Sequence, residues 1–204
     1  MLRYDPSTQV LDTIAELPGT ERNNIDFRVM GASLLAASSP DRLFLADTHS
    51  DSIEVYDSEG HRLDRLRSPF PARPVPASAK VEKVRRWEQR DGSVEAHFPY
   101  EYPERLPHAA RIRADPSGNL WVAAFPEPRG VLYSGLLDRA LAPQGFDDGF
   151  TWQILGRSGV SLATLQTPPR HFVFEVGEDY TLGISWLDFD VQRVELYAVK
   201  RAAS

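Results

Sequence analysis

Runs rich in β-forming residues recur along this chain and are separated by short clusters of turn residues. Between Ala110 and Val122, one such run leads into Asp115-Pro116-Ser117-Gly118-Asn119 and then into a second run. Similar pairs of runs surround Ser39-Pro40-Asp41 and Gly177-Glu178-Asp179. Two runs joined by Asp, Pro, Ser and Gly are typical of a β-hairpin. The pattern therefore predicts antiparallel strands along most of the chain.

A second type of hairpin occurs three times. Residues 2–14, 54–66 and 153–165 align with one another, and each contains a strand, a tight turn and a second strand. Internal repeats indicate a repeat architecture. The two hairpin types together give a unit of four antiparallel strands, which is the blade of a β-propeller. We therefore expect an all-β, propeller-type fold.

The repeats fill about three blades of one partial domain, 1–204. Four-stranded blades are expected at 33–68 and 109–166, and 171–200 supplies three more strands. Two further strands lie within 2–17, which suggests that an N-terminal strand completes the last blade. Propellers close with about four to eight blades. We therefore expect either a homodimer that closes the ring, because twofold pairing is the commonest symmetry, or a longer chain that supplies the missing blades.

Two insertions interrupt the repeat, at 69–108 and 126–149. The first begins with a Pro-rich stretch and continues into a predicted helix near 77–90. In the expected strand order, all the longer loops join second to third strands or one blade to the next. Those links lie at the same end of every blade. Long loops on a rigid scaffold often carry function, so we expect the binding site at that end.

Composition and charge exclude several classes of function. Hydrophobic residues make up 42% and charged residues 25% of the chain, as in ordinary globular proteins. The net charge of −6 gives no electrostatic basis for binding nucleic acid or an anionic membrane. No cysteine is present, which excludes disulfides, thiolate metal sites and a cysteine nucleophile. We find no export signal at the start and no run long enough to span a membrane.

Five polar or aromatic residues are candidates for a ligand site at the loop-bearing end. His49 and Asp51 lie in one predicted loop. They are either a metal-binding or acid–base pair, or part of a polar loop whose side chains bond nearby backbone. His108 leads into a predicted innermost strand, where it either faces the central channel or satisfies backbone groups. Tyr100 and Tyr102 lie in a Pro-rich loop and suit a carbohydrate or peptide groove, or else they pin the loop to the scaffold.

Two carboxylates complete the candidates. Asp188 and Asp190 have the spacing of calcium ligands, but the other oxygen positions and the glycine of an EF-hand are missing, and a solvated turn also explains them. We expect no cofactor, and Ca²⁺ is the one ion that these carboxylates suggest. His61 lies in a tight turn at the opposite end, where we expect it to be exposed or structural. No metalloprotease, nucleophile-elbow, dinucleotide or P-loop motif occurs, so no catalytic residue and no metal site is assigned.

The chain resembles a known group of proteins. The stretch from Leu106 to Val122 is similar to the six-bladed β-propellers that are common in bacteria and related to NHL-repeat propellers. The tail from Phe174 to Tyr197 looks like the final blade of that group, and the Pro-rich insert before a helix is similar too. The resemblance covers nearly the whole chain as the C-terminal half of a typical member. It implies a propeller that is exported, periplasmic or at the cell surface, and it specifies no chemistry.

Two functions are compatible with these observations. We expect a non-enzymatic propeller scaffold that binds a ligand or another protein. The alternative is a propeller hydrolase or lyase, similar to lactonases, with a metal in the central channel. Such enzymes need several carboxylates that point into the channel. The predicted innermost strands at 34–37, 110–113 and 172–176 offer only Glu175, which argues against a catalytic metal.

Overall fold

The computed structural model describes residues 2–5, 7–13, 16, 22–23, 26–27, 31–77, 103–126, 149–187 and 191–200. The elements assigned in this part of the chain are all β-strands, so the all-β prediction is confirmed. Beyond Ala77, the helix expected near 77–90 lies outside the described residues. No helix in the described part has the length and apolar character that crossing a membrane requires.

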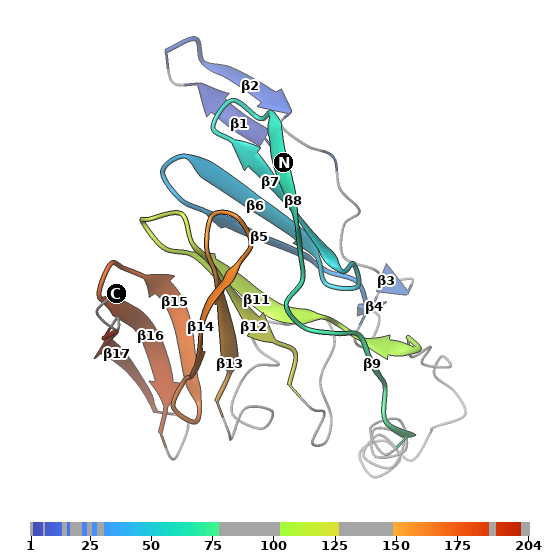
Figure 1. Cartoon of the computed structure of the whole chain (residues 1–204), viewed down its shortest axis with the longest axis vertical. Helices are drawn as coiled ribbons and strands as arrows, with labels where there is room; N and C mark the ends of the chain where they lie inside the picture. Colours follow the sequence, from blue (N-terminus) through green and yellow to red (C-terminus); the bar gives the residue numbers. More distant parts are fainter. Residues whose placement is uncertain are drawn as a thin grey trace.

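Most strands belong to three antiparallel sheets, here called the first, second and third sheets (Figure 1). The first sheet has the order β5 (Leu34–Ser38), β6 (Arg42–Asp47), β7 (Ser52–Asp57) and β8 (Arg62–Arg67). The second has the order β11 (Ala109–Ala114), β12 (Leu120–Ala124), β13 (Thr151–Leu155) and β14 (Ser161–Gln166). The third consists of β15 (His171–Val176), β16 (Tyr180–Trp186) and β17 (Gln192–Ala198).

Six shorter strands form two-stranded sheets. The pairs are β1 (Leu2–Asp5) with β2 (Val10–Thr13), β3 (Arg22–Asn23) with β4 (Asp26–Phe27), and β9 (Arg73–Pro74) with β10 (Arg105–Leu106). The last two pairs were not predicted, because a two-residue strand is too short to show a period. Among the described strands β1 and β2 pair only with each other, so no N-terminal strand completes the third sheet within this chain.

Three five-residue turns share one geometry and join β7 to β8, β11 to β12 and β13 to β14. In each turn the first amide donates to the fifth carbonyl, and the amide of the fourth residue donates to the first carbonyl. That fourth residue is Gly60, Gly118 or Gly159, with φ of 92°, 77° and 79° respectively. A side chain is strained at such angles, whereas glycine adopts them freely. The repeated glycine in the sequence therefore encodes the turn directly.

The three sheets stack face to face, with their first strands side by side. Strand β11 contacts β5 on one side and β15 on the other, and the N-terminal hairpin and the third sheet lie at opposite ends of the stack (Figure 1). One core lies between the first and second sheets and contains Phe44, Ile53, Val55, Ile112, Leu120 and Val122. A second core lies between the second and third sheets and contains Trp121, Ala123, Phe150, Trp152, Phe172 and Val173.

Strand β12 of the second sheet is buried on both faces, because successive side chains of a strand point to opposite sides. On β12, Leu120 and Val122 enter the first core, whereas Trp121 and Ala123 enter the second. Each of the four is at most 2% exposed. Trp121 meets Trp152 of β13 edge-on, with 6.5 Å between the ring centroids. The large rings of the second sheet therefore fill the space between two sheets.

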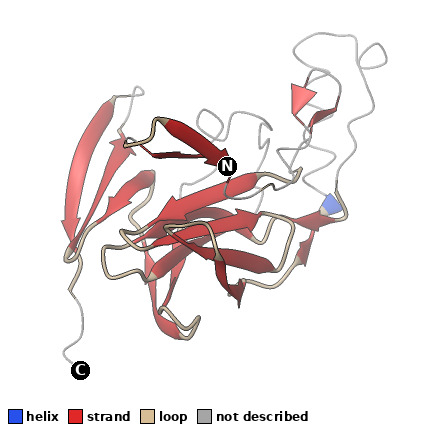
Figure 2. Cartoon of the chain, turned by 90° about the horizontal axis from the view of Figure 1, so that it is seen from above, coloured by secondary structure: helices blue, strands red, loops and turns tan. Residues whose placement is uncertain are grey.

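Short turns of the first two sheets meet at one end of the stack. Arg157, in the turn between β13 and β14, forms an ion pair with Asp41 of the turn between β5 and β6. The guanidinium of Arg42 donates to the carbonyl of Arg157 at 2.9 Å. The hydrogen bond from Arg157 holds the pKa of the Asp41 carboxyl below its ordinary value. Figure 2 draws the strands in red and the links between them in tan.

Replacing Trp152 with alanine should destabilise the protein strongly. The Trp152 side chain is 0% exposed and packs against Trp121 and Phe150. Removal of a buried tryptophan ring costs about 3–5 kcal/mol. Urea unfolding followed by circular dichroism measures the effect. Val160→Ala, on an exposed turn, is the control and should change the free energy of unfolding by less than about 0.5 kcal/mol. A Trp152→Ala protein as stable as the parent would contradict the assigned core.

Candidate functional site

A pocket of about 690 Å³ lies at the end of β6 that is opposite the turn between β5 and β6. Three segments far apart in the sequence form its walls: the loop after β6, the loop after β8, and the residues just before β11. The side chains that give the pocket its chemistry are those of His49, Asp51, Arg67, Phe70, Arg105 and His108.

Backbone hydrogen bonds tie these segments to the first sheet. The amide of His108 donates to the carbonyl of Thr48 at 2.6 Å, and the amide of Ser68 donates to the carbonyl of Asp51 at 2.7 Å. Thr48 is buried, and its hydroxyl accepts a hydrogen bond from the amide of Ser33 at 2.9 Å. The sheet therefore holds the walls of the pocket in place.

His108 is half-buried, and Nδ1 of its imidazole lies 2.8 Å from the carbonyl oxygen of Phe70. Because a carbonyl only accepts hydrogen bonds, we assign the proton to Nδ1, and Nε2 is then the acceptor of the neutral ring. The sequence predicted either a channel-facing histidine or one that satisfies backbone groups. In the structure, Nδ1 satisfies a backbone carbonyl.

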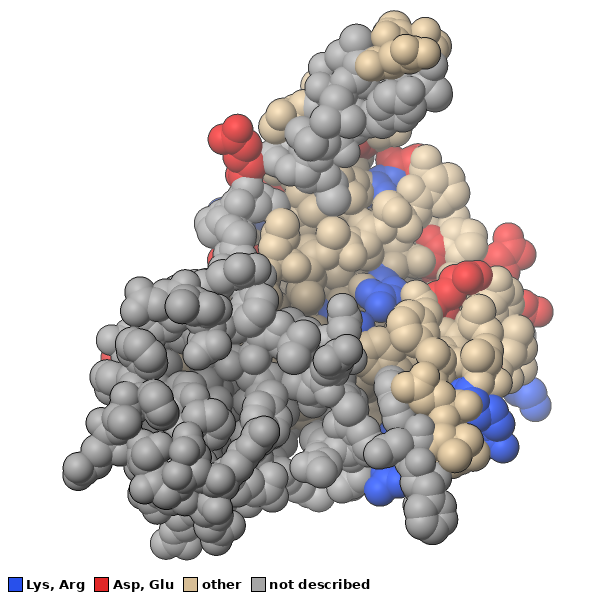
Figure 3. Space-filling view, turned by 180° about the vertical axis from the view of Figure 1, so that it is seen from behind, with Lys and Arg blue, Asp and Glu red and all other residues tan. Residues whose placement is uncertain are grey.

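The charges in the pocket favour an anion. Arg67 and Arg105 are permanent cations, and His49 and His108 are half-buried beside them. Asp51 is the single carboxylate among the lining residues. On the described part of the face in Figure 3, Lys and Arg (blue) and Asp and Glu (red) lie in small, separate groups. The two arginines and two histidines of the lining therefore attract an anion to the pocket.

The structure brings together three of the residues singled out from the sequence. His49, Asp51 and His108 line the same pocket. The other four candidates, Tyr100, Tyr102, Asp188 and Asp190, lie outside the described residues. Arg67, Phe70 and Arg105 were missed, because no local motif marks an arginine or phenylalanine that meets a histidine from a distant segment.

A second polar cluster lies in the turn between β7 and β8. Ligand atoms of Asp57, Glu59 and His61 lie within 4.8 Å of one another. Asp57 accepts hydrogen bonds from the amides of Glu59 and His61, at 2.9 and 2.8 Å, and so stabilises the turn. The His61 side chain is 72% exposed, as the sequence predicted for this turn. The structure of the turn is a sufficient explanation for this cluster.

A charged network crosses the third sheet and had no motif in the sequence. Glu195 of β17 accepts hydrogen bonds from the hydroxyls of Ser185 and Tyr197, the latter at 2.8 Å. Arg193 forms an ion pair with the same carboxylate. These contacts, and the Ser185 hydroxyl most of all, lower the pKa of Glu195 from 4.5 to about 2. The network links two neighbouring strands through one carboxylate.

His171 of β15 extends this network. Its Nδ1 lies 2.9 Å from Oγ of Ser185, and its ring meets Tyr197 edge-on at 4.8 Å. Burial lowers the pKa of His171, against the opposing effect of Glu195. A catalytic serine gives its proton to the histidine. Here Ser185 donates to Glu195, so the three residues form a cross-strand network and not a hydrolase triad.

Comparisons of the chain with protein-family models, with curated proteins and with solved structures find no match. The resemblance to NHL-related propellers therefore stays a prediction. The pocket and the stacking of the sheets are the features that bear on the function.

Replacing Glu195 with glutamine should remove part of the pH dependence of stability. Because the pKa of Glu195 is lower in the folded protein, the carboxylate stabilises the fold above pH 4.5, and this contribution is lost as the pH falls from 4.5 to about 2. The difference in urea midpoint between parent and Glu195→Gln should therefore shrink over that range. Glu104→Gln, at an exposed residue, is the control. A difference that does not change with pH would contradict the assigned network.

Proposed function

We propose that this chain is part of a β-propeller-type scaffold that binds a small anionic ligand in the pocket formed by His49, Arg67, Arg105 and His108. The observation that carries the proposal is the convergence of two histidines and two arginines from separate segments on one hollow. That hollow lies at the end of the first sheet away from its short turns, where long links on a rigid scaffold would carry function.

The stacking of the sheets supports a propeller arrangement. Each sheet has its strands in chain order, and the first strands β5, β11 and β15 are neighbours. Blades that follow one another around a central axis place their first strands in this way. Completion of the ring is part of the proposal, either by a second copy of the chain or by further blades of a longer one.

A carboxylate or phosphate group fits the chemistry of the pocket. A guanidinium offers paired donors to either group, and a histidine adds one more donor when it is protonated or suitably oriented. Phe70 gives the pocket an apolar wall for the remainder of the ligand. A volume of about 690 Å³ lies within the usual range of about 300–1,000 Å³ for small-molecule pockets.

A metal-dependent hydrolase has less support. Among the described residues of β5, β11 and β15, the one carboxylate is Glu175. It accepts a hydrogen bond from the hydroxyl of Tyr180 at 2.6 Å. A catalytic metal needs several protein ligands at one site, so a single engaged carboxylate gives no basis for one.

Arg67→Ala should weaken anion binding. Isothermal titration calorimetry at neutral pH with citrate, inorganic phosphate and a panel of small carboxylates and phosphate esters should find saturable binding to the parent. Loss of one charged hydrogen-bonding partner should raise the dissociation constant by about tenfold or more, which corresponds to about 1.4 kcal/mol. Arg105→Ala should weaken binding in the same direction.

Arg62→Ala is the matched control, because Arg62 is an exposed arginine at the far end of the same strand, β8. It should leave the dissociation constant unchanged. Absence of binding by every anion of the panel, or equal binding by Arg67→Ala and parent, would contradict the proposed function.

A further inference from the structure

The outer face of the third sheet, on the side away from the second sheet, is apolar and exposed. Val194 is 68% and Leu196 63% exposed. Leu182 and Ile184 pair directly with Leu196 and Val194 and are half-buried. Contiguous apolar surface of this kind marks an interaction site more often than isolated exposed residues do.

In the other two sheets the residues at these positions are buried, except Ile154, which is half-buried. The turn between the first and second strands aligns the three sheets. It is closed by a hydrogen bond to the carbonyl of Arg42 in the first sheet, Asn119 in the second and Tyr180 in the third. Two residues further on, three equivalent cross-strand pairs follow: Phe44 with Val55, Trp121 with Ile154, and Leu182 with Leu196. The next pairs along the strands are Ala46 with Ile53, Ala123 with Trp152, and Ile184 with Val194.

The difference in exposure between equivalent positions is large. Val55 is 0% and Ile53 2% exposed, because the second sheet covers them. Trp152 is 0% exposed, because it lies in the core with the third sheet. Leu196 and Val194 stand at the positions of Val55 and Ile53, and no described sheet covers them. The third sheet therefore presents the face that its two counterparts use to bind the next sheet.

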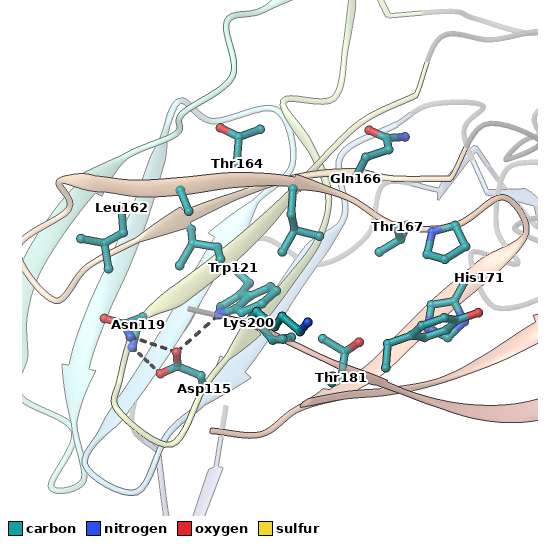
Figure 4. Close-up of a pocket in the computed structure, with 17 residues that line it drawn as sticks. Asp115, Asn119, Trp121, Leu162, Thr164, Gln166, Thr167, His171, Thr181 and Lys200 are labelled. Carbon is teal, nitrogen blue, oxygen red and sulfur yellow. Dashed lines mark hydrogen bonds between the residues drawn. The ribbon is translucent and has the colours of Figure 1, made fainter. Parts of the chain in front are cut away.

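The outer edge of the third sheet is open as well. Among the described strands β17 pairs only with β16, and a groove of about 850 Å³ lies between β17 and β14 (Figure 4). Leu165 lines this groove, whereas its repeat counterpart Leu66 is 4% exposed. Gly159, in the turn before β14, covers Leu66. A Cβ atom at this glycine would lie 3.0 Å from the leucine side chain. The groove lies where a fourth strand of the third sheet would cover Leu165.

We propose that this face and edge bind a second copy of the chain, whose strand β2 adds to β17. The inference rests on the proposed propeller arrangement and not on the anion pocket. Residues 2–14 repeat the third and fourth strands of the other sheets, so β2 has the sequence of a fourth strand. The N-terminal hairpin and the third sheet lie at opposite ends of the stack (Figure 1), which makes a second copy the donor. Two copies then close a ring of six four-stranded sheets.

As a pairing partner for β2, strand β17 matches the sequence repeat better than β1 does. In the repeat, Arg3 of β1 stands at the position of Val55 and Ile154, where the other sheets carry an apolar residue. Leu196 of β17 supplies an apolar residue at that position. Exchange of β1 for the β17 of another copy would therefore place leucine at a position where the repeat carries an apolar residue.

Size-exclusion chromatography with light scattering on the full chain tests the proposal. We expect a dimer, and the double variant Val194→Asp/Leu196→Asp should be a folded monomer by circular dichroism, with a dimer dissociation constant raised at least about 100-fold. Val160→Asp, at a residue 63% exposed in a turn, should remain dimeric. A parent that is monomeric at every concentration, or a double variant that still dimerises, would overturn the proposal.

Cysteine pairs test the strand addition without relying on a destabilised variant, because the chain has no cysteine of its own. Val55 pairs with Asp64 in the first sheet, so Leu196 should lie opposite Asp12 of the second copy. A mixture of Leu196→Cys and Asp12→Cys proteins should form a disulfide-linked dimer, whereas Leu196→Cys with Ser7→Cys should not. Failure of the first pair to cross-link would overturn the added strand.

The two proposals fail separately. A monomer that still binds the anion panel would overturn the second-copy interface and leave the pocket intact. A cross-linked dimer that binds no anion would overturn the proposed ligand and support the interface.

Discussion

Burial of apolar side chains between neighbouring sheets is the interaction on which the rest of this structure depends. The second sheet has no solvent-facing side near its centre, so adjacent residues such as Leu120 and Trp121 serve two different cores. Tight turns with a left-handed glycine fix the register that makes this possible. A shift by one residue would exchange the two cores' side chains, which differ in size.

The candidate site follows from this stacking. Sheets that are rigid and packed hold the ends of β6, β8 and β11 at fixed positions, and the segments attached there enclose a pocket with four basic side chains. The same stacking explains the open face of the third sheet. Its exposed apolar residues occupy the positions that are buried in the other sheets, such as those of Val55 and Trp152. In the described part of the chain, the third sheet has a neighbouring sheet on one side only.

The strands were predictable because their signals are local. Each hairpin is encoded by a turn of five residues between β-rich runs, and Gly60, Gly118 and Gly159 lie at the same place in each turn. The pocket was predictable only in part. His49 and His108 could be singled out, but their meeting with Arg67 depends on contacts between segments that no local pattern relates. The Ser185–Glu195 network was missed for the same reason, because it depends on the pairing of two strands.

Hydrogen–deuterium exchange of strand β17 tests the central claim most directly, namely that every sheet of this chain is built to pack between two others. At rising protein concentration the amides of residues 192–198 should exchange progressively more slowly, because a second copy covers their edge and face. Those of β12, already enclosed on both sides, should not change. Fast exchange in 192–198 that is the same at every concentration would contradict the account.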